Sequence, residues 1–133
     1  MMRKKIEFLS EVKNLCLVEK LIDDISTELN ISDEIYGKIQ VSIIEGVNNA
    51  IFHGNKLDGS KMVVLSSFTD DNFLVFTIVD EGTGFNFNRI PDPTSPENIE
   101  KPHGRGVFLM KHLSDDLKFF DEGRKIEIKF KLN

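Results

Sequence analysis

The chain has 133 residues, of which 40% are hydrophobic and 29% charged, and this length is typical of a single domain spanning residues 1–133. The formal net charge of −5, without a basic stripe along the sequence, argues against nucleic acid as a partner. No apolar run reaches the roughly 18 residues that a membrane helix needs, and the single cysteine, Cys16, allows no internal disulfide, so we expect a cytoplasmic protein without a membrane span.

The N-terminal residues predict a strand followed by a helix. Apolar and polar residues alternate over Lys4–Leu9, which is typical of a strand. Ser10 is then the expected cap of a helix. Apolar residues recur at helical intervals over Val12–Leu29, and Asn30 is expected to end this helix.

A second helix is expected directly afterwards. Ser32 is a favourable N-cap, and the two acidic residues that follow it suit the positive end of a helix dipole. Helical spacing of apolar residues continues to about Phe52, and Gly54 is a natural stop.

The second half of the chain predicts two hairpins separated by a long loop and a short helix. Met62–Thr69 and Phe73–Val79 form the first expected hairpin. Residues 86–103 contain all four prolines and no periodicity, so we expect a mobile functional loop. A short helix at Val107–Leu113 precedes a last hairpin that turns at residues 122 and 123. This order predicts an α+β fold, a two-layer sandwich with a mixed, mostly antiparallel sheet and helices on one face.

Polar residues are unusually dense in "EGVNNAIFHGN", near the end of the second helix. Glu45, Asn49, Phe52 and His53 share one stripe at helical spacing. Carboxylate and amide oxygens facing one cleft suit Mg²⁺, or the carboxylate could act as a base, or the stripe could be a solvated face. His53 lacks a second histidine or cysteine at zinc-ligand spacing, and a hydrogen-bonded residue at a helix end is the simpler interpretation.

Two glycine motifs follow the first hairpin, one directly after its second strand and one at the end of the long loop. In "DEGTGF", Asp80 ends a strand and could accept a hydrogen bond from an exocyclic amine, while Gly82 and Gly84 allow a sharp turn and the close approach of a planar ligand. The alternative is a simple turn. In "KPHGRG", Gly104 and Gly106 precede a helix whose free N–H groups favour an anion such as phosphate. The alternative is a helix that merely opens at glycine.

The order of these motifs resembles the GHKL (Bergerat-fold) ATP-binding domains, which occur in gyrase, heat-shock chaperones, mismatch-repair ATPases and sensor histidine kinases. Within that superfamily the chain is most similar to the small anti-sigma-factor serine kinases. "IIEGVNNAIFHGN" resembles their SEAVTNAxxHG box, "IVDEGTGF" their VxDEGxGF, and "GRGVFLMKHLSDDLKF" their GxGxxxMxxxMDxVxx. The resemblance covers essentially the whole chain.

The resemblance implies a site for ATP and Mg²⁺. Glu45 would be the general base that takes a proton from a serine hydroxyl or from water, and Asn49 would hold the Mg²⁺ that bridges the phosphates. Asp80 would bind the adenine amine, and residues 86–103 would be the lid. Further nucleotide contacts are expected from His53, Gly82, Gly84, Phe85, Lys101, His103, Gly104, Arg105 and Gly106.

The resemblance also implies an activity and partners. We expect an ATP-dependent serine/threonine protein kinase that phosphorylates a serine of an antagonist protein in a partner-switching system, holds a sigma factor when free, and forms a homodimer. A non-catalytic nucleotide-gated binding module and a slow ATPase of the same fold are the alternatives. The chain departs from the family at the final hairpin, where Gly123 and Arg124 stand in place of the usual Gly-Thr, and in the acidic residues of its first helix.

Overall fold

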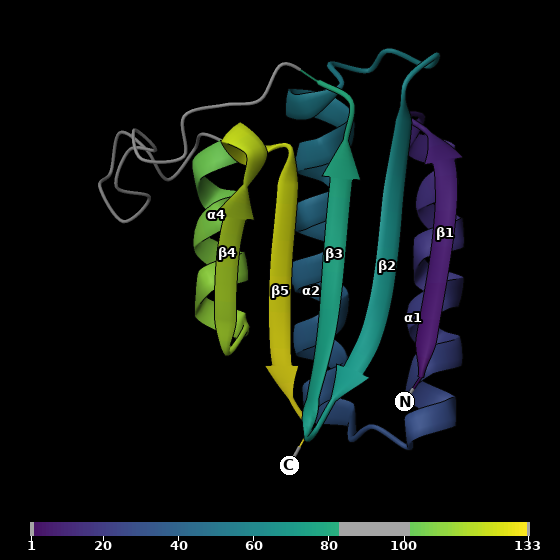
Figure 1. Cartoon of the computed structure of the whole chain (residues 1–133), viewed down its shortest axis with the longest axis vertical. Helices are drawn as coiled ribbons and strands as arrows, with labels where there is room; N and C mark the ends of the chain where they lie inside the picture. The colour runs from purple at the N-terminus through teal and green to yellow at the C-terminus, as the bar shows by residue number, and fades with distance from the viewer. Residues whose placement is uncertain (1, 83–101, 133) are drawn as a thin grey trace.

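The computed structural model describes residues 2–82 and 102–132, apart from the side chains of residues 102–105. A five-stranded sheet forms one layer, and helices α1, α2 and α4 cover one of its faces (Figure 1). The predicted α+β two-layer sandwich is therefore confirmed. The sheet was expected to be mixed, whereas every pairing among its described strands is antiparallel.

The sheet has the strand order β1-β2-β3-β5-β4. Its strands are β1 Arg3–Leu9, β2 Met62–Asp70, β3 Phe73–Asp80, β4 Asp116–Phe120 and β5 Lys125–Lys131. The three strands whose bounds were predicted, β1, β2 and β3, lie within one residue of them, because their alternating pattern marks one face as buried. β1 and β3 end, and β2 begins, at the same edge of the sheet, the upper edge in Figure 1.

The first helix begins later than its apolar spacing predicts. A short 3-10 turn, η1 (Val12–Asn14), precedes α1 (Leu15–Leu29). Ser10 does not cap either element: it is buried and its hydroxyl donates to the carbonyl oxygen of Lys61 at 2.8 Å. Asn30 ends α1 in the left-handed conformation, with φ of 50°, as its role as a helix stop requires.

The second helix, α2 (Asp33–Asn48), begins at the predicted cap, where the Ser32 hydroxyl accepts the N–H of Ile35 at 3.4 Å. It continues as a π-helical turn, η2 (Asn49–Gly54). In this turn the N–H of Asn55 reaches back five residues to the carbonyl of Ala50, at 2.8 Å. Single π-helical turns are frequent at functional sites, and this one was not predicted from the sequence.

The core lies between the inner face of the sheet and the helices, with Phe76 and Phe130 packed edge to face at 6.1 Å between ring centroids. Gly46 brings α2 close to the sheet, since a Cβ there would lie 2.5 Å from Ile78 Cδ1 and 3.3 Å from Met110 Sδ. This close packing fixes the position of the helix turn that also carries Glu45.

Helix α4 (Pro102–Leu113) is longer than the predicted Val107–Leu113, and η4 (Asp121–Gly123) joins β4 to β5 at the predicted turn. Proline is favoured at the first position of a helix, so Pro102 begins α4 about one turn early. Within the described ranges, no helix combines the length and apolarity that crossing a membrane requires.

Candidate functional site

Three of the predicted site residues meet where the C-terminal part of α2 lies against the first turns of α4. A Cβ added to Gly106 would lie 3.0 Å from Glu45 Oε2 and 3.4 Å from both Oδ1 and Nδ2 of Asn49. The side chains of Glu45 and Asn49 therefore face the same glycine backbone. Gly106 leaves the space that these two polar groups occupy, and any larger residue would push them aside.

The amide of Asn49 is placed as a ligand-binding group would be. The residue is only 6% exposed, and its Nδ2 has no hydrogen-bond partner among residues 2–82 and 102–132. A buried amide is costly to leave unpaired unless a ligand or another group satisfies it. We therefore infer that a bound ligand supplies the hydrogen-bond acceptor for Asn49 Nδ2.

The side-chain oxygen atoms of Glu45 and Asn49 are suitable ligands for Mg²⁺. A carboxylate and an amide supply the oxygen atoms that Mg²⁺ prefers, and Mg²⁺ is commonly held by one or two protein groups together with phosphates and water. In the part of the chain that the structure describes, no three His, Cys, Asp or Glu side chains gather into a metal cluster. A metal here would thus depend on a second ligand such as a nucleotide for most of its coordination.

The second part of the site is the carboxylate at the end of β3. Asp80 is 9% exposed, and its Oδ1 accepts the N–H of Gly82 at 2.8 Å. Gly54 packs directly on this carboxylate, because a Cβ at Gly54 would come within 3.0 Å of all three terminal atoms of the Asp80 side chain. The sequence predicted Gly54 only as a helix stop, so its packing on Asp80 is a new finding.

The groups around Asp80 shift the pKa of its carboxyl in opposite directions. Burial raises the pKa of the Asp80 carboxyl above its ordinary value, while the Gly82 N–H and the positive charges of Arg124 and Lys61 act in the lowering direction. Asp121 adds a small raising effect. The net upward shift means that the ionised carboxylate is held in a partly desolvated place, where a hydrogen-bond donor from a ligand would be favourable.

Arg124 is the residue that departs from the resembled family, and it lies next to this carboxylate. Its carbonyl oxygen accepts the N–H of Asp80 at 2.9 Å, and its guanidinium pairs with Asp121 at 3.0 Å. The final hairpin thus supplies a positive charge near Asp80 in place of a threonine hydroxyl. Its charge partly offsets the burial of Asp80.

The predicted stripe is interrupted after Asn49. The π-helical turn changes the spacing there, and Phe52 and His53 are exposed while Asn49 is buried. Although His53 as a residue is exposed, protein atoms around part of its imidazole desolvate it, and this desolvation lowers its pKa. A nucleotide contact from His53 remains a proposal that depends on a ligand reaching beyond the Glu45–Asn49 pair.

Several predicted site residues lie outside the described part of the chain: Gly84, Phe85, Lys101 and lid residues 86–101. The backbones of His103, Gly104 and Arg105 are described and lie in the first turn of α4, as does residue 102. The two glycines therefore sit inside the helix, whereas the sequence had placed them before it. The N–H groups of this turn belong to the positive end of the α4 dipole, as the phosphate interpretation requires.

The contact between Gly54 and Gly82 gives a direct stability prediction. A Cβ on Gly82 would collide with the carbonyl oxygen of Gly54, a backbone atom that cannot rotate away. Gly82→Ala should therefore lower the free energy of unfolding by about 1–3 kcal/mol. Urea unfolding followed by circular dichroism measures this change.

Gly37→Ala is the matched control for that experiment. Gly37 lies inside α2, and a Cβ there meets no atom within 4 Å. Alanine should raise the free energy of unfolding by roughly 0.5–1 kcal/mol, because it restricts the unfolded chain and favours the helix. Equal stabilities of Gly82→Ala and the wild type would contradict the close contact of the two glycines.

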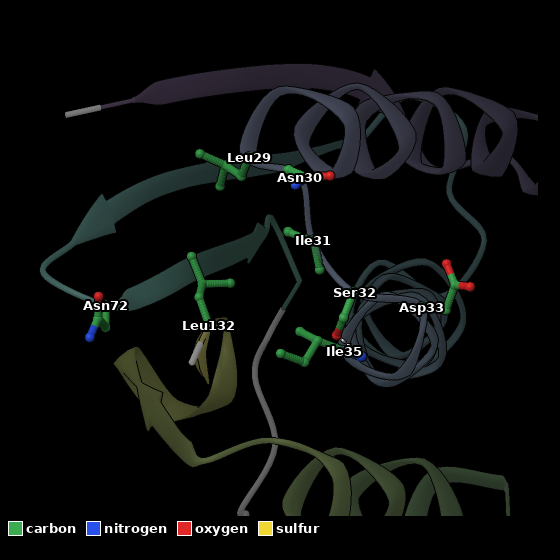
Figure 2. A pocket seen from close by; sticks show the side chains of 8 residues that line it. All are labelled: Leu29, Asn30, Ile31, Ser32, Asp33, Ile35, Asn72 and Leu132. Carbon is green, nitrogen blue, oxygen red and sulfur yellow. Dashed lines mark hydrogen bonds between the residues drawn. The ribbon is translucent and has the colours of Figure 1, made fainter.

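A pocket at the opposite end of the molecule contains none of the predicted site residues. It lies between the α1–α2 connection, the β2–β3 turn and the end of β5 (Figure 2). Its lining residues are Leu29, Asn30, Ile31, Ser32, Asp33, Ile35, Asn72 and Leu132. It is therefore separate from the candidate site.

Comparisons with known proteins agree with the resemblance found in the sequence. Residues 8–130 match the family described as histidine kinase-like ATPase domain. An anti-sigma F factor of Clostridium perfringens is 28% identical over 137 residues, which cover 98% of this chain and 97% of that protein. The anti-sigma F factor of Clostridium acetobutylicum is 29% identical over 135 residues, with coverages of 97% and 93%.

Two further comparisons cover less of the matched protein. A serine-protein kinase RsbW of Bacillus cereus is 27% identical over 95 residues, which are 66% of this chain and 59% of that kinase. The crystal structure of the RsbU and RsbW domains of a Mycobacterium tuberculosis protein superposes with a TM-score of 0.68 at 14% identity. It matches 98% of this chain, which spans 32% of that longer one, and it supports the fold.

Proposed function

Because this chain belongs to the histidine kinase-like ATPase domain family, which implies ATP binding, we propose that it is a serine/threonine protein kinase of the anti-sigma-factor type. It transfers the γ-phosphate of ATP to a serine of an antagonist protein in a cytoplasmic partner-switching system. When the antagonist is absent, it holds a sigma factor. The observation that carries this proposal is the meeting of Glu45, Asn49 and Gly106, with Asn49 Nδ2 buried and unpaired among the described residues.

The relatives support this choice within the family. Two are anti-sigma F factors that match over nearly their whole length, and a third is a serine-protein kinase. A family of one fold hosts several activities, so the argument for a kinase depends on the site as well as on these names.

The chemistry assigned to α2 and α4 is positioning and proton transfer. Asn49 would hold Mg²⁺, which supplies neutralising charge to the phosphates when it is bound. The first turn of α4 presents backbone N–H groups that favour phosphate oxygens. Glu45 accepts the proton of the serine hydroxyl as that oxygen attacks. Such an arrangement suffices for phosphoryl transfer, which depends mainly on orientation and charge.

The chemistry assigned to the end of β3 is recognition of the base. The Asp80 carboxylate accepts a hydrogen bond from the exocyclic amine of adenine. Its orientation is fixed on one side by the Gly82 N–H and on the other by Gly54. Because Asp80 is nearly buried, this hydrogen bond replaces lost hydration and discriminates against bases that lack the amine.

We also propose a homodimer formed through the face of the sheet opposite the helices, which faces the viewer in Figure 1. The register pairs Val64 with Val79 across β2 and β3, and both side chains are half-buried. Val64 alternates with the buried Val63 and Val79 with the buried Ile78, so this apolar pair points to the face without helices. A molar mass from light scattering tests the dimer directly.

Transfer of label from γ-labelled ATP separates the proposed kinase from its alternatives. The purified chain is incubated with Mg²⁺, labelled ATP and an extract of the cells that encode it. We expect the label as phosphoserine on another protein. Label released only as inorganic phosphate would favour a slow ATPase, and ATP binding without turnover would favour a nucleotide-gated binding module.

A further inference from the structure

The buried side chain of Asn55 lies outside the assigned site and connects its two parts, the helix turn with Asn49 and the strand end with Asp80. Asn55 directly follows η2 and is 1% exposed. Its Nδ2 donates to Ser10 Oγ at 2.6 Å and to the carbonyl oxygen of Met62 at 3.0 Å. Its Oδ1 accepts the N–H of Glu81 at 2.8 Å. A buried amide with this many hydrogen bonds holds its neighbours in one arrangement.

The partners of Asn55 come from the ends of three strands. Ser10 follows β1, Met62 begins β2 and Glu81 follows β3, all at the upper edge of the sheet in Figure 1. A further hydrogen bond closes this network: the Met62 N–H donates to Glu81 Oε1 at 2.5 Å. Three strand ends and the end of η2 are thus joined at one buried side chain.

The network acts on the peptide group that follows Asp80. The N–H of Glu81 belongs to the same peptide unit as the carbonyl of Asp80, so the bond to Asn55 fixes the orientation of that unit. The residue before Asn55, Gly54, packs on the Asp80 carboxylate. The backbone N–H of Asn55 also bonds to Ala50, which is adjacent to Asn49. Asn55 therefore relates the carboxylate of Asp80 to the helix turn that carries Asn49.

We propose that Asn55 is a positioning residue that sets the orientation of the Asp80 carboxylate toward the amine of adenine. The inference rests on the proposed ATP site and adds to it a determinant of base selectivity. The polar atoms of the Asn55 side chain already bond to Ser10, Met62 and Glu81, so we assign it no contact with the nucleotide. It acts through the Asp80–Glu81 peptide group and through Gly54.

A positioning role and a merely structural role differ in one measurable quantity. ITP carries an oxygen where ATP carries the amine, so it cannot donate to Asp80 at that position. Loss of orientation should weaken ATP much more than ITP and lower the ratio of their affinities. A general loss of stability would lower both affinities together and leave the ratio unchanged.

The experiment measures the affinities of ATP and ITP, each with Mg²⁺, for the wild type, Asn55→Ala and Leu74→Val. Leu74→Val is the control, because Leu74 is fully buried in β3 near the β2–β3 turn, at the other end of the sheet. All proteins are compared at a temperature at which circular dichroism shows them folded. We expect the preference for ATP over ITP to fall about tenfold in Asn55→Ala, the loss of roughly one good hydrogen bond, and to be retained in Leu74→Val.

The outcomes distinguish this inference from the proposed function. A wild type that does not prefer ATP over ITP would overturn both. A wild-type preference that persists in Asn55→Ala would overturn the positioning role alone. If Asn55→Ala does not fold, the same ratio is measured for Asn55→Ser, whose shorter side chain cannot span Ser10, Met62 and Glu81 together, and the same two results decide.

Discussion

Glu45→Gln is expected to retain ATP binding and to lose phosphotransfer by about 10²–10⁴-fold, the usual contribution of a general base. Glutamine has nearly the shape of glutamate, so it should fit beside Gly106 and Asn49 as the native side chain does. It cannot accept a proton from the attacking hydroxyl. Binding should therefore survive because it depends on Asn49, Asp80 and the first turn of α4.

The measurement pairs calorimetric titration of ATP with turnover of γ-labelled ATP in the extract described above. Glu34→Gln is the control, since Glu34 is an exposed carboxylate in the first turn of α2, at the far end of that helix, where it forms a surface ion pair with Lys38. It should behave as the wild type in both assays. Loss of ATP binding in Glu45→Gln would show that Glu45 holds the ligand and is not primarily a base.

Asp80→Asn is expected to weaken ATP binding about 10–100-fold while making the ligand-free protein more stable at neutral pH. The affinity falls because an amide can turn its N–H₂ group toward the adenine amine, and two donors cannot bond. The stability rises because asparagine removes a buried negative charge. The amide oxygen can still accept the N–H of Gly82, so the local turn should persist.

The predicted rise in stability of Asp80→Asn follows from how the stability of the folded protein depends on pH. Burial raises the pKa of Asp80 in the folded protein, so between the unfolded and folded pKa values the folded state binds more protons. The contribution of Asp80 to stability is therefore present below its unfolded pKa and is lost as the pH rises through its folded pKa. Asn at position 80 does not titrate, so Asp80→Asn should not lose this stability as the pH rises.

Thermal unfolding from pH 4 to 8 measures the change, with Asp58→Asn as the control. Hydrogen bonds from Ser60 lower the pKa of Asp58 below its ordinary value, so its contribution to stability is lost only at more acidic pH, and Asp58→Asn should leave the pH dependence over this range nearly unchanged. If Asp80→Asn were less stable than the wild type at neutral pH, the carboxylate would be better satisfied in the ligand-free protein than its burial indicates.

The fold could be predicted from the sequence because its signals are local. Alternation along the strands, helical spacing in α1 and α2, and stops such as Asn30 all depend on neighbouring residues. The errors occur where a distant partner decides. Ser10 was expected to cap a helix, but Lys61 and Asn55, far along the chain, take up its hydroxyl.

The proximity of some candidate site residues could be predicted from the order of motifs along the chain. Glu45, Asn49 and Gly106 were selected from motif order, and the structure brings them together. The π-helical turn and the contact of Gly54 with Asp80 depend on tertiary packing and leave no periodic signal. Asn55 belongs to a stretch dense in amides, but nothing local indicates that its side chain joins three strand ends.

Calorimetric titration of ATP into the wild type and Asn49→Ala, each with and without Mg²⁺, tests the nucleotide site most directly. Asn72→Ala, in the exposed β2–β3 turn at the opposite end, is the control. We expect Mg²⁺-dependent binding by the wild type and by Asn72→Ala, and an affinity at least about tenfold lower in Asn49→Ala. Absence of ATP binding in every condition, or equal Mg²⁺-dependent binding by Asn49→Ala, would contradict the proposed site.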